Sequence, residues 1–119
     1  ARRLQRGDTQ AKVELKQLLL HIIKREFPSI ESNNVSPDDL LELLRVFSCR
    51  QADLVLHWIR VGYVQGNMNS DNCLLCGKTM DYGPFGFMEQ YDPLWTPFTS
   101  DPAKNFSFEK QDVAAQINL

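Results

Sequence analysis

The chain of 119 residues has no long apolar run and no excess of charge of one sign. Its longest apolar stretch, residues 18–23, is interrupted by His21 and falls far short of the ~20 residues that a membrane-spanning helix needs. The formal net charge is −2, from 13 Lys and Arg against 15 Asp and Glu, so charge gives no argument for nucleic acid or an anionic membrane as a partner. We therefore expect a protein that binds neither.

Cysteine is also scarce. Cys49, Cys73 and Cys76 are an odd number in a chain without secretory features, which favours reduced thiols. Cys73 and Cys76 have the spacing of a metal knuckle, but no second pair follows them. The simpler interpretation is that they are small apolar residues of a strand. The chain has neither an initial Met nor an apolar signal core, so we expect any targeting information to lie upstream.

Two segments have the apolar spacing of helices. The first is predicted over residues 10–26, with Thr9 as its cap and the Phe27-Pro28 pair at its end. The second is predicted over residues 37–62, because Ser36-Pro37-Asp38-Asp39 offers a cap, a proline at the first position and acids in the first turn. A break near Cys49 remains an alternative to one continuous helix.

Beyond Gly62 the helical period is lost. Residues 63–72 read as a loop, and residues 73–80 as a tight β-hairpin that turns at Gly77 and Lys78. Residues 81–112 are rich in proline, glycine and aromatic side chains without a period, which is typical of a functional or docked segment. The predicted fold is mainly α with a short β-hairpin.

Two polar clusters flank the predicted hairpin. The adjacent pair Asp71 and Asn72 precedes Asp81, which begins an Asp-Tyr-Gly, with nine residues from Asn72 to Asp81. A hairpin would bring its two ends together, and carboxylate and amide oxygens are hard ligands suited to Mg²⁺. The alternative is that these side chains only form turns with their own backbone. Protein kinases provide a precedent for the metal site, which they build from the Asp and Asn of a catalytic loop and the Asp of a later D-F-G.

Other motifs fit less well. Gly77-Lys78-Thr79 matches the end of a phosphate-binding P-loop, but the first glycine of that motif would stand where Asn72 is found, so this interpretation is rejected. A standard protein kinase is not indicated either. Its catalytic Asp precedes the Asn by five positions in H-R-D-x-x-x-x-N, whereas Asp71 and Asn72 are adjacent.

Together these residues resemble one family. The stretches MNSDN (68–72), DYGPFGF (81–87) and YDP (91–93) closely resemble selenoprotein O, the YdiU-type protein adenylyltransferases, whose pattern is roughly HGVMNTDN, DYGPFGF and YDP. The WIRVG stretch (58–62) resembles the helix end that precedes this pattern in the family. The resemblance covers essentially the whole chain and is most specific from residue 66 to 93.

The resemblance implies a kinase-like fold that transfers AMP from ATP to Ser, Thr or Tyr hydroxyls of proteins, with Mg²⁺ and ATP as cofactor and substrate. Carried over by position, Asp71 is the proton acceptor, Asn72 and Asp81 bind the metal, and Asp81 also lies near the nucleotide. Gln65, where the family usually has His, and Gly83 are expected to support the loop. The chain departs from the family pattern at three further places. Asn67 replaces Val, Ser70 replaces Thr, and Cys73-Leu74-Leu75 replaces Met-Ser-Ile. Phe85 and Phe87 are expected to be packing anchors.

A kinase-like enzyme also needs a Lys-bearing strand and a Glu-bearing helix in its smaller lobe, and this chain has no candidates for them. We therefore expect a fragment of the larger lobe, with residues 81–112 corresponding to the activation segment, that is inactive alone. The alternatives are phosphoryl transfer of the kinase type and a non-catalytic pseudoenzyme that binds partners. The resemblance implies a mitochondrial compartment if the source is eukaryotic, and a cytoplasmic one otherwise.

Overall fold

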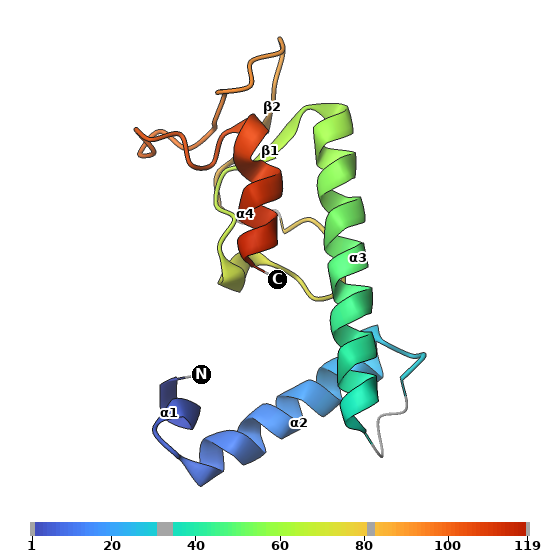
Figure 1. Ribbon diagram of the computed structural model, residues 1–119. Coiled ribbons are helices and arrows are strands. Elements are labelled where there is room, and N and C mark those ends of the chain that lie inside the picture. The colour runs from blue at the N-terminus through green and yellow to red at the C-terminus, as the bar shows by residue number, and fades with distance from the viewer. Residues whose placement is uncertain (1, 31–34, 81–82, 119) are drawn as a thin grey trace. The chain divides into compact units, whose positions relative to one another are not determined.

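The computed structural model describes residues 2–30, 35–80 and 83–118 (Figure 1). The chain divides into two compact units, residues 1–45 and 46–119, with the boundary inside one helix. Residues 31–34, which lie between the two predicted helices, and the Asp81-Tyr82 pair lie outside the described residues. Over the parts that are described, no helix combines the length and the apolarity that crossing a membrane requires.

The first unit contains α1 (Arg2–Gln5) and α2 (Thr9–Glu26). Helix α2 begins one residue before the predicted start, because its cap is Asp8 and not Thr9. The Asp8 carboxylate accepts the N–H of Ala11 at 3.1 Å. Within α2 only Ile23 is buried, and Val13, Leu15 and Leu18 of the apolar period are about half exposed. The apolar period therefore predicts the helix, although these three side chains are not buried. The unit's buried apolar side chains are Ile23, Phe27, Ile30 and Leu43.

The long helix α3 (Pro37–Val61) runs without a break at Cys49. Ser36 is the cap that the sequence predicts, and the structure adds that the capping is reciprocal. The Asp39 carboxylate accepts the Ser36 N–H at 2.8 Å, and the Ser36 hydroxyl oxygen accepts the Asp39 N–H at 3.2 Å. Gly62 ends the helix with φ +69°, a conformation that glycine adopts at little cost. The side chains that α3 buries recur at helical spacing: Leu43, Phe47, Gln51, Val55 and Trp58.

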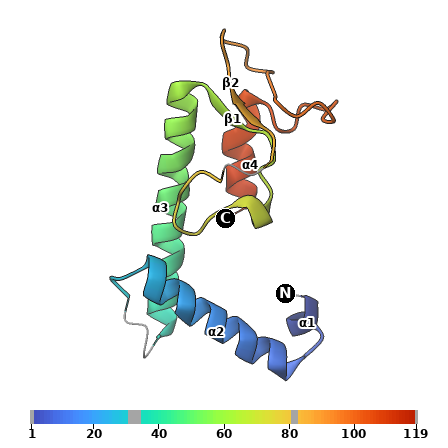
Figure 2. The same ribbon diagram turned by 180° about the vertical axis from the view of Figure 1, so that it is seen from behind.

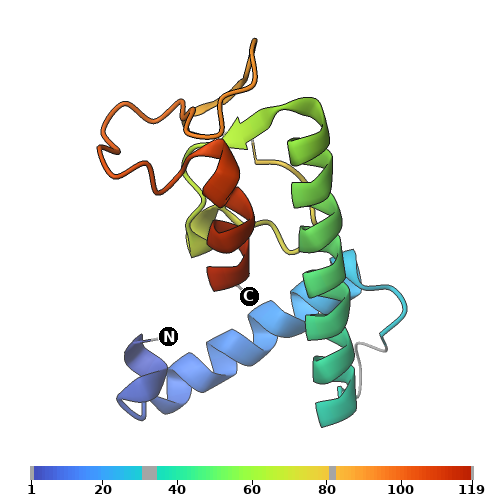
Figure 3. The same ribbon diagram turned by 45° about the horizontal axis from the view of Figure 1, so that its top comes forward.

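The second unit contains a two-stranded antiparallel sheet, but its strands are not the predicted ones. Strand β1 (Tyr63–Gln65) pairs with β2 (Phe85–Phe87), in the register Tyr63↔Phe87, Val64↔Gly86 and Gln65↔Phe85. The loop expected over residues 63–72 therefore begins with a strand. In Figure 3, β1 follows directly on the end of α3. The pairing joins the segments just outside the two polar clusters, not the segment between them.

Residues 73–80 contain a turn, in which the Gly77 N–H donates to the Leu74 carbonyl at 3.0 Å, but they form no hairpin and are bonded to α3 instead of to a partner strand. The side chain of Gln51 donates to the Leu74 carbonyl at 2.9 Å, and the indole of Trp58 donates to Thr79 Oγ1 at 2.9 Å. Gly77, at φ +72°, lies so close to α3 that a Cβ there would be 2.6 Å from Arg50 Cβ. Figure 2 shows this segment returning along α3.

The C-terminal part folds back onto β1. After β2, turns lead to the short helix η2 (Phe108–Lys110) and then to α4 (Gln111–Ile117). The second unit's core cluster joins α3, β1, the following loop and α4 through Val55, Trp58, Tyr63, Met68 and Ala115. Phe85 and Phe87 both pack on the ring of Tyr63, as expected of packing anchors, although they remain 45% and 60% exposed.

Candidate functional site

Asp71 and Asn72 lie in a 3₁₀ turn, η1 (Ser70–Asn72), that local hydrogen bonds shape. The Asn72 N–H donates to the Asn69 carbonyl at 2.9 Å, and the Asn69 N–H donates to the Asn67 carbonyl at 3.0 Å. The side-chain amide of Asn69 also donates to Asn67 Oδ1 at 2.8 Å. The loop is thus held by asparagine side chains as well as by backbone, as the turn interpretation of the sequence expects.

The two site residues on the turn have different roles in it. Asn72 Nδ2 donates to the Asn67 carbonyl at 2.9 Å, a bond in which the other amide atom, Oδ1, takes no part. Asp71 is exposed, and none of the bonds that shape the turn engages its carboxylate. The turn therefore fixes Asn72 structurally and presents the Asp71 carboxylate to solvent. Of the two possibilities left open by the sequence, the turn is confirmed, and the ligand set stays a prediction for the same residues.

The second cluster approaches the first through the residues that follow it. Asp81 is outside the described residues, but Gly83 packs on Asn67. A Cβ on Gly83 would lie 3.2 Å from Asn67 Nδ2, and its φ of +102° is itself unfavourable for other residues. One residue further on, the Pro84 carbonyl accepts the Gly66 N–H at 2.9 Å. The chain thus brings the two motifs next to each other, through strand pairing and not through a hairpin.

Gln65 lies on β1 and is buried at 2% exposure. Its Oε1 accepts a hydrogen bond from the Tyr63 hydroxyl. Gln65 Nε2 is buried without a hydrogen-bond partner in the described structure, which is uncommon for a buried amide. The predicted support of the loop by Gln65 remains a proposal. What the structure shows is that the buried Gln65 side chain is hydrogen-bonded to Tyr63, two positions before it on β1.

Two amides that were not singled out from the sequence contact this region: Gln111, the first residue of α4, and Asn118, its C-cap. Gln111 Nε2 donates to the Tyr63 carbonyl at 3.0 Å, and Asn118 Nδ2 donates to the Met68 carbonyl at 3.1 Å. Sequence reasoning missed them because the bonds span 48 and 50 residues. A signal was present, however. Gln111 and Asn118 are seven residues apart, a spacing that places two side chains on the same face of a helix. Amides at both positions, where apolar side chains would be ordinary on a packed face, indicate polar contacts.

A groove of about 430 Å³ borders the turn on the α4 side. Asn69 and Ser70 of the loop form one wall, and Lys110 of η2 and Val113 of α4 belong to the other. The groove brings polar loop residues and an apolar helix face to one surface, adjacent in sequence to Asp71. The further lining residues are Met68, Asn105, Phe106, Ala114, Ile117 and Asn118.

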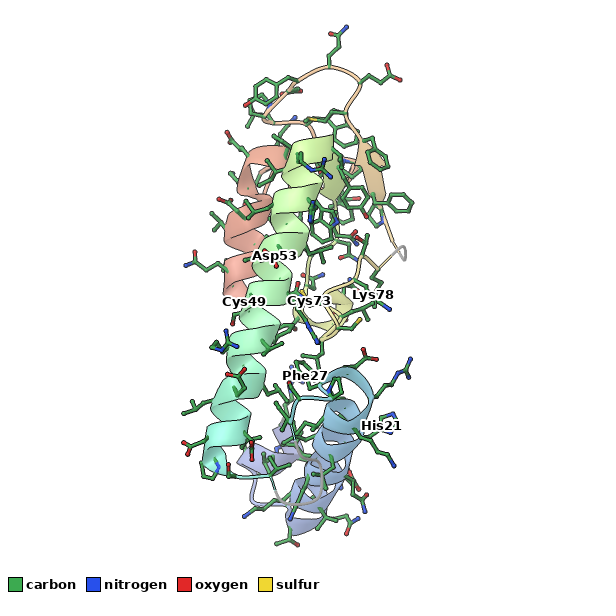
Figure 4. The ribbon with its side chains drawn as sticks, turned by 90° about the vertical axis from the view of Figure 1, so that its right-hand side faces the viewer. His21, Phe27, Cys49, Asp53, Cys73 and Lys78 are labelled. Atoms are coloured by element: carbon green, nitrogen blue, oxygen red, sulfur yellow. The ribbon has the colours of Figure 1, made fainter. Side chains whose placement is uncertain are left out.

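The cysteines form no metal centre in the described structure. Cys49 is exposed on α3, whereas Cys73 and Cys76 are half-buried on the segment beside it, which is not paired into a sheet. Burial raises the pKa of the Cys73 thiol, whose sulfur lies 3.9 Å from Gln51 Oε1. No group of three or more His, Cys, Asp or Glu suited to a metal occurs among the described residues. Figure 4 labels Cys49 and Asp53 on α3, and Cys73 and Lys78 on the neighbouring segment.

The donor chemistry of the turn fits a hard divalent cation. An amide oxygen and a carboxylate follow one another in the sequence, and Mg²⁺ binds oxygen donors while retaining several waters. Asn72 is well placed to offer Oδ1, because its nitrogen is already used by Asn67. The carboxylate of Asp81 belongs to the same donor class.

Similar proteins are nucleotidyltransferases. The chain is 39% identical over 118 residues to the "Protein nucleotidyltransferase YdiU" of Rhodopirellula baltica, a match that covers 96% of this chain and 21% of the relative. For the proteins of the same name from Flavobacterium johnsoniae and Methylobacillus flagellatus, identity is 41% over 106 residues and 39% over 109. These matches cover 88% and 91% of this chain, and 20% and 21% of the relatives.

A sequence model of the family Protein adenylyltransferase SelO matches residues 4–119. The chain therefore belongs to this family, which confirms the resemblance drawn from the motifs. It spans about a fifth of the length of the curated relatives it matches. Those relatives are bacterial, so they give no support to a mitochondrial compartment.

Proposed function

We propose that the complete protein containing this chain transfers AMP from ATP to hydroxyl side chains of other proteins, with Asp71 as the proton acceptor. The observation that carries the proposal is the Asp71 carboxylate, which is exposed on a turn whose own hydrogen bonds leave it unused. A carboxylate that is not committed to the fold can accept a hydrogen bond from an incoming hydroxyl and then its proton. Membership of the adenylyltransferase family supports AMP as the group transferred.

Asn72 and Asp81 are proposed to hold Mg²⁺, with Asp81 also near the nucleotide phosphates. When bound, the cation would neutralise charge on the triphosphate and on the leaving pyrophosphate. The residues of this chain orient the reaction. The bond from Asn72 to the Asn67 carbonyl fixes the amide, and Gly83 against Asn67 ties the second motif to the same loop. Gln65 and Gly83 thus act as supports and not as reacting groups.

A kinase-like larger lobe remains the proposed context, with residues 81–112 as the counterpart of an activation segment. The proposal is supported by a mainly helical chain in which an Asp-Asn turn and an Asp-Tyr-Gly motif flank one segment. The remaining ATP-binding groups would then come from outside these 119 residues, and the chain alone would be inactive. The proposed partners are ATP and proteins with accessible Ser, Thr or Tyr.

The position of the radioactive label distinguishes the candidate reactions. The complete protein is incubated with a protein substrate and either α-labelled or γ-labelled ATP. AMP transfer labels protein only from α-labelled ATP, and phosphoryl transfer labels it only from γ-labelled ATP. Label from γ-ATP alone would contradict the proposal, and no label from either would favour a pseudoenzyme.

The metal assignment is tested separately. Asp81→Ala should abolish transfer and weaken the binding of Mg-ATP, measured by titration calorimetry with and without Mg²⁺. Lys78→Ala is the control, because Lys78 is an exposed residue of the same segment with no assigned role. Unchanged binding and activity in Asp81→Ala would remove Asp81 from the site.

A further inference from the structure

The Asp71 turn has little of its own to keep it in place. Helix η1 has three residues, none of them buried, and its cap residue Asn69 makes no side-chain capping bond. Among the described residues, the hydrogen bonds that shape residues 67–72 are local, except for one that arrives from α4. A turn held only by local bonds would adjust easily, and proton transfer requires a fixed distance between base and hydroxyl.

That bond comes from Asn118, which joins the end of α4 to the base of the turn. Its Nδ2 donates to the Met68 carbonyl at 3.1 Å and to the Ala114 carbonyl at 3.0 Å, one bond for each amide hydrogen. The Asn118 backbone N–H caps the helix by donating to the Ala115 carbonyl at 3.0 Å. Asn118 is therefore fixed at both its backbone and its side chain.

The two ends of this link are anchored in the core. The side chains of Met68 and Ala115 are 4% and 8% exposed and belong to one apolar cluster. Two turns earlier on the same helix, Gln111 makes the equivalent bond to the Tyr63 carbonyl. Helix α4 thus binds the backbone of residues 63–68 at both ends, and the Asn118 bond lies at the end nearer to Asp71.

We propose that Asn118 is a positioning residue, which acts through the Met68 carbonyl to hold Asp71 at the distance that hydroxyl activation requires. The inference rests on the proposed function. Loss of the bond should reduce turnover and leave the binding of ATP nearly unchanged, because Asn118 supplies no ligand to the nucleotide. A small misplacement of a catalytic group can reduce the rate about a hundredfold, so we expect a ten- to hundredfold fall in kcat.

The test uses two matched amide-to-acid changes on α4 in the complete protein. Asn118→Asp keeps the shape but places an oxygen opposite two carbonyls, whereas Gln116→Glu makes the same chemical change at an exposed position. The expected result is a ten- to hundredfold lower kcat in Asn118→Asp, with KM for ATP within twofold of wild type, and no change in Gln116→Glu. Asn118→Ala, which adds no charge, should show a smaller fall of the same kind.

A double variant distinguishes positioning of Asp71 from a purely structural role of Asn118. In the Asp71→Asn background, Asn118→Asp should add little to the loss, because the group that it positions is already disabled. The proposal is overturned if kcat is retained, if the loss matches the fraction of unfolded protein in thermal melts, or if the two losses multiply. Wild type is assayed first with α-labelled ATP. Absence of AMP transfer there contradicts the proposed function, whereas normal transfer in both wild type and Asn118→Asp contradicts only this inference.

Discussion

Helix α2 and the segment of residues 63–72 differ in opposite directions in two properties, the amount of regular secondary structure and the burial of side chains. The helix has 18 residues of regular structure and buries one of them, and the bonds that define its start are local, including ion pairs from Arg3 to Asp8 and to Glu14 at 2.9 Å. The segment has one three-residue strand and one 3₁₀ turn, yet Tyr63, Val64 and Gln65 are each at most 5% exposed.

The comparison teaches that regular structure and tertiary anchoring are separate properties of this chain. Bonds that define α2 join residues close in sequence, whereas residues 63–68 are held by α4 side chains about 50 residues away. Substitutions should therefore have small effects on α2 and large effects around the segment.

The largest effect is expected at Asp71. Asp71→Asn removes the proton acceptor while keeping the shape of the side chain, and should lower the rate of AMP transfer about 10²- to 10⁴-fold. Asp53→Asn, an equivalent change at an exposed position of α3, should leave the rate unchanged. Initial rates with α-labelled ATP provide the measurement, and an unaltered rate in Asp71→Asn would show that another group accepts the proton.

Burial is compared by making one chemical change on α2 and the same change in the core cluster to which Tyr63 and Met68 belong. Val55 is 4% exposed in the core cluster and Val13 is 49% exposed on α2. Val55→Ala should destabilise by about 2 kcal/mol, from lost burial and a residual cavity. Val13→Ala should change stability by less than about 0.5 kcal/mol, since little burial is lost and alanine favours helices.

Urea denaturation of the complete protein, with intact secondary structure checked beforehand, gives both values. Equal effects for the two substitutions would contradict the distinction between the regions. A larger loss for Val13→Ala would show that α2 buries its apolar face in the complete protein.

Thiol reactivity gives a third comparison. Burial raises the pKa of the Cys73 thiol, and the thiolate is the reactive form, so Cys73 should react several-fold more slowly than the exposed Cys49 at neutral pH. Mass spectrometry of iodoacetamide-treated protein identifies the modified residue over time. Faster labelling of Cys73 would mean that the segment beside α3 opens in solution.

The smallest effect is expected from the cap of α3. Bonds from the Ser36 backbone and hydroxyl lower the pKa of the Asp39 carboxyl, so the folded state binds this proton more weakly than the unfolded state does. The stabilisation is thus present above the pKa of unfolded Asp, near about 4, and is lost as the pH falls through the lowered value. Asp39→Asn should flatten this acid loss of helicity, followed by circular dichroism at 222 nm. An identical acid transition in the variant would assign it to other groups.

What the sequence could predict follows the same division. Both long helices were predictable because their signals are local: Ser36 with Asp39 marks a start, and Gly62 marks an end. The turn at Asp71 and Asn72 was predictable because asparagine and aspartate favour turns, whereas the roles given to these two residues stay predictions. Strand pairing was not, because Tyr63–Gln65 has no pattern that selects Phe85–Phe87 over the residues between them.

The contacts of the site were the least predictable part. An asparagine at position 118 is polar at the end of a short helix, and sequence alone cannot say that its amide reaches Met68. Gly77 in a tight turn suggested a hairpin, but the real constraint is its approach to Arg50 on α3. In each case, long-range packing and not local preference determines the outcome.

The pairing of β1 with β2 also affects how this region could vary. It closes residues 66–84 into a loop whose neck is fixed by the strands and by the Gly66–Pro84 bond. The entropy of closing a loop grows slowly with length, by only about 0.6 kcal/mol for a doubling. Chain entropy would therefore allow extra residues in this loop, but beside Lys78 they would displace Gly77 from Arg50 and Thr79 from Trp58. A slip of one residue at the neck would turn every strand side chain to the opposite face, so contacts with α3 and the strand register, and not the entropy of closure, limit how this loop can vary.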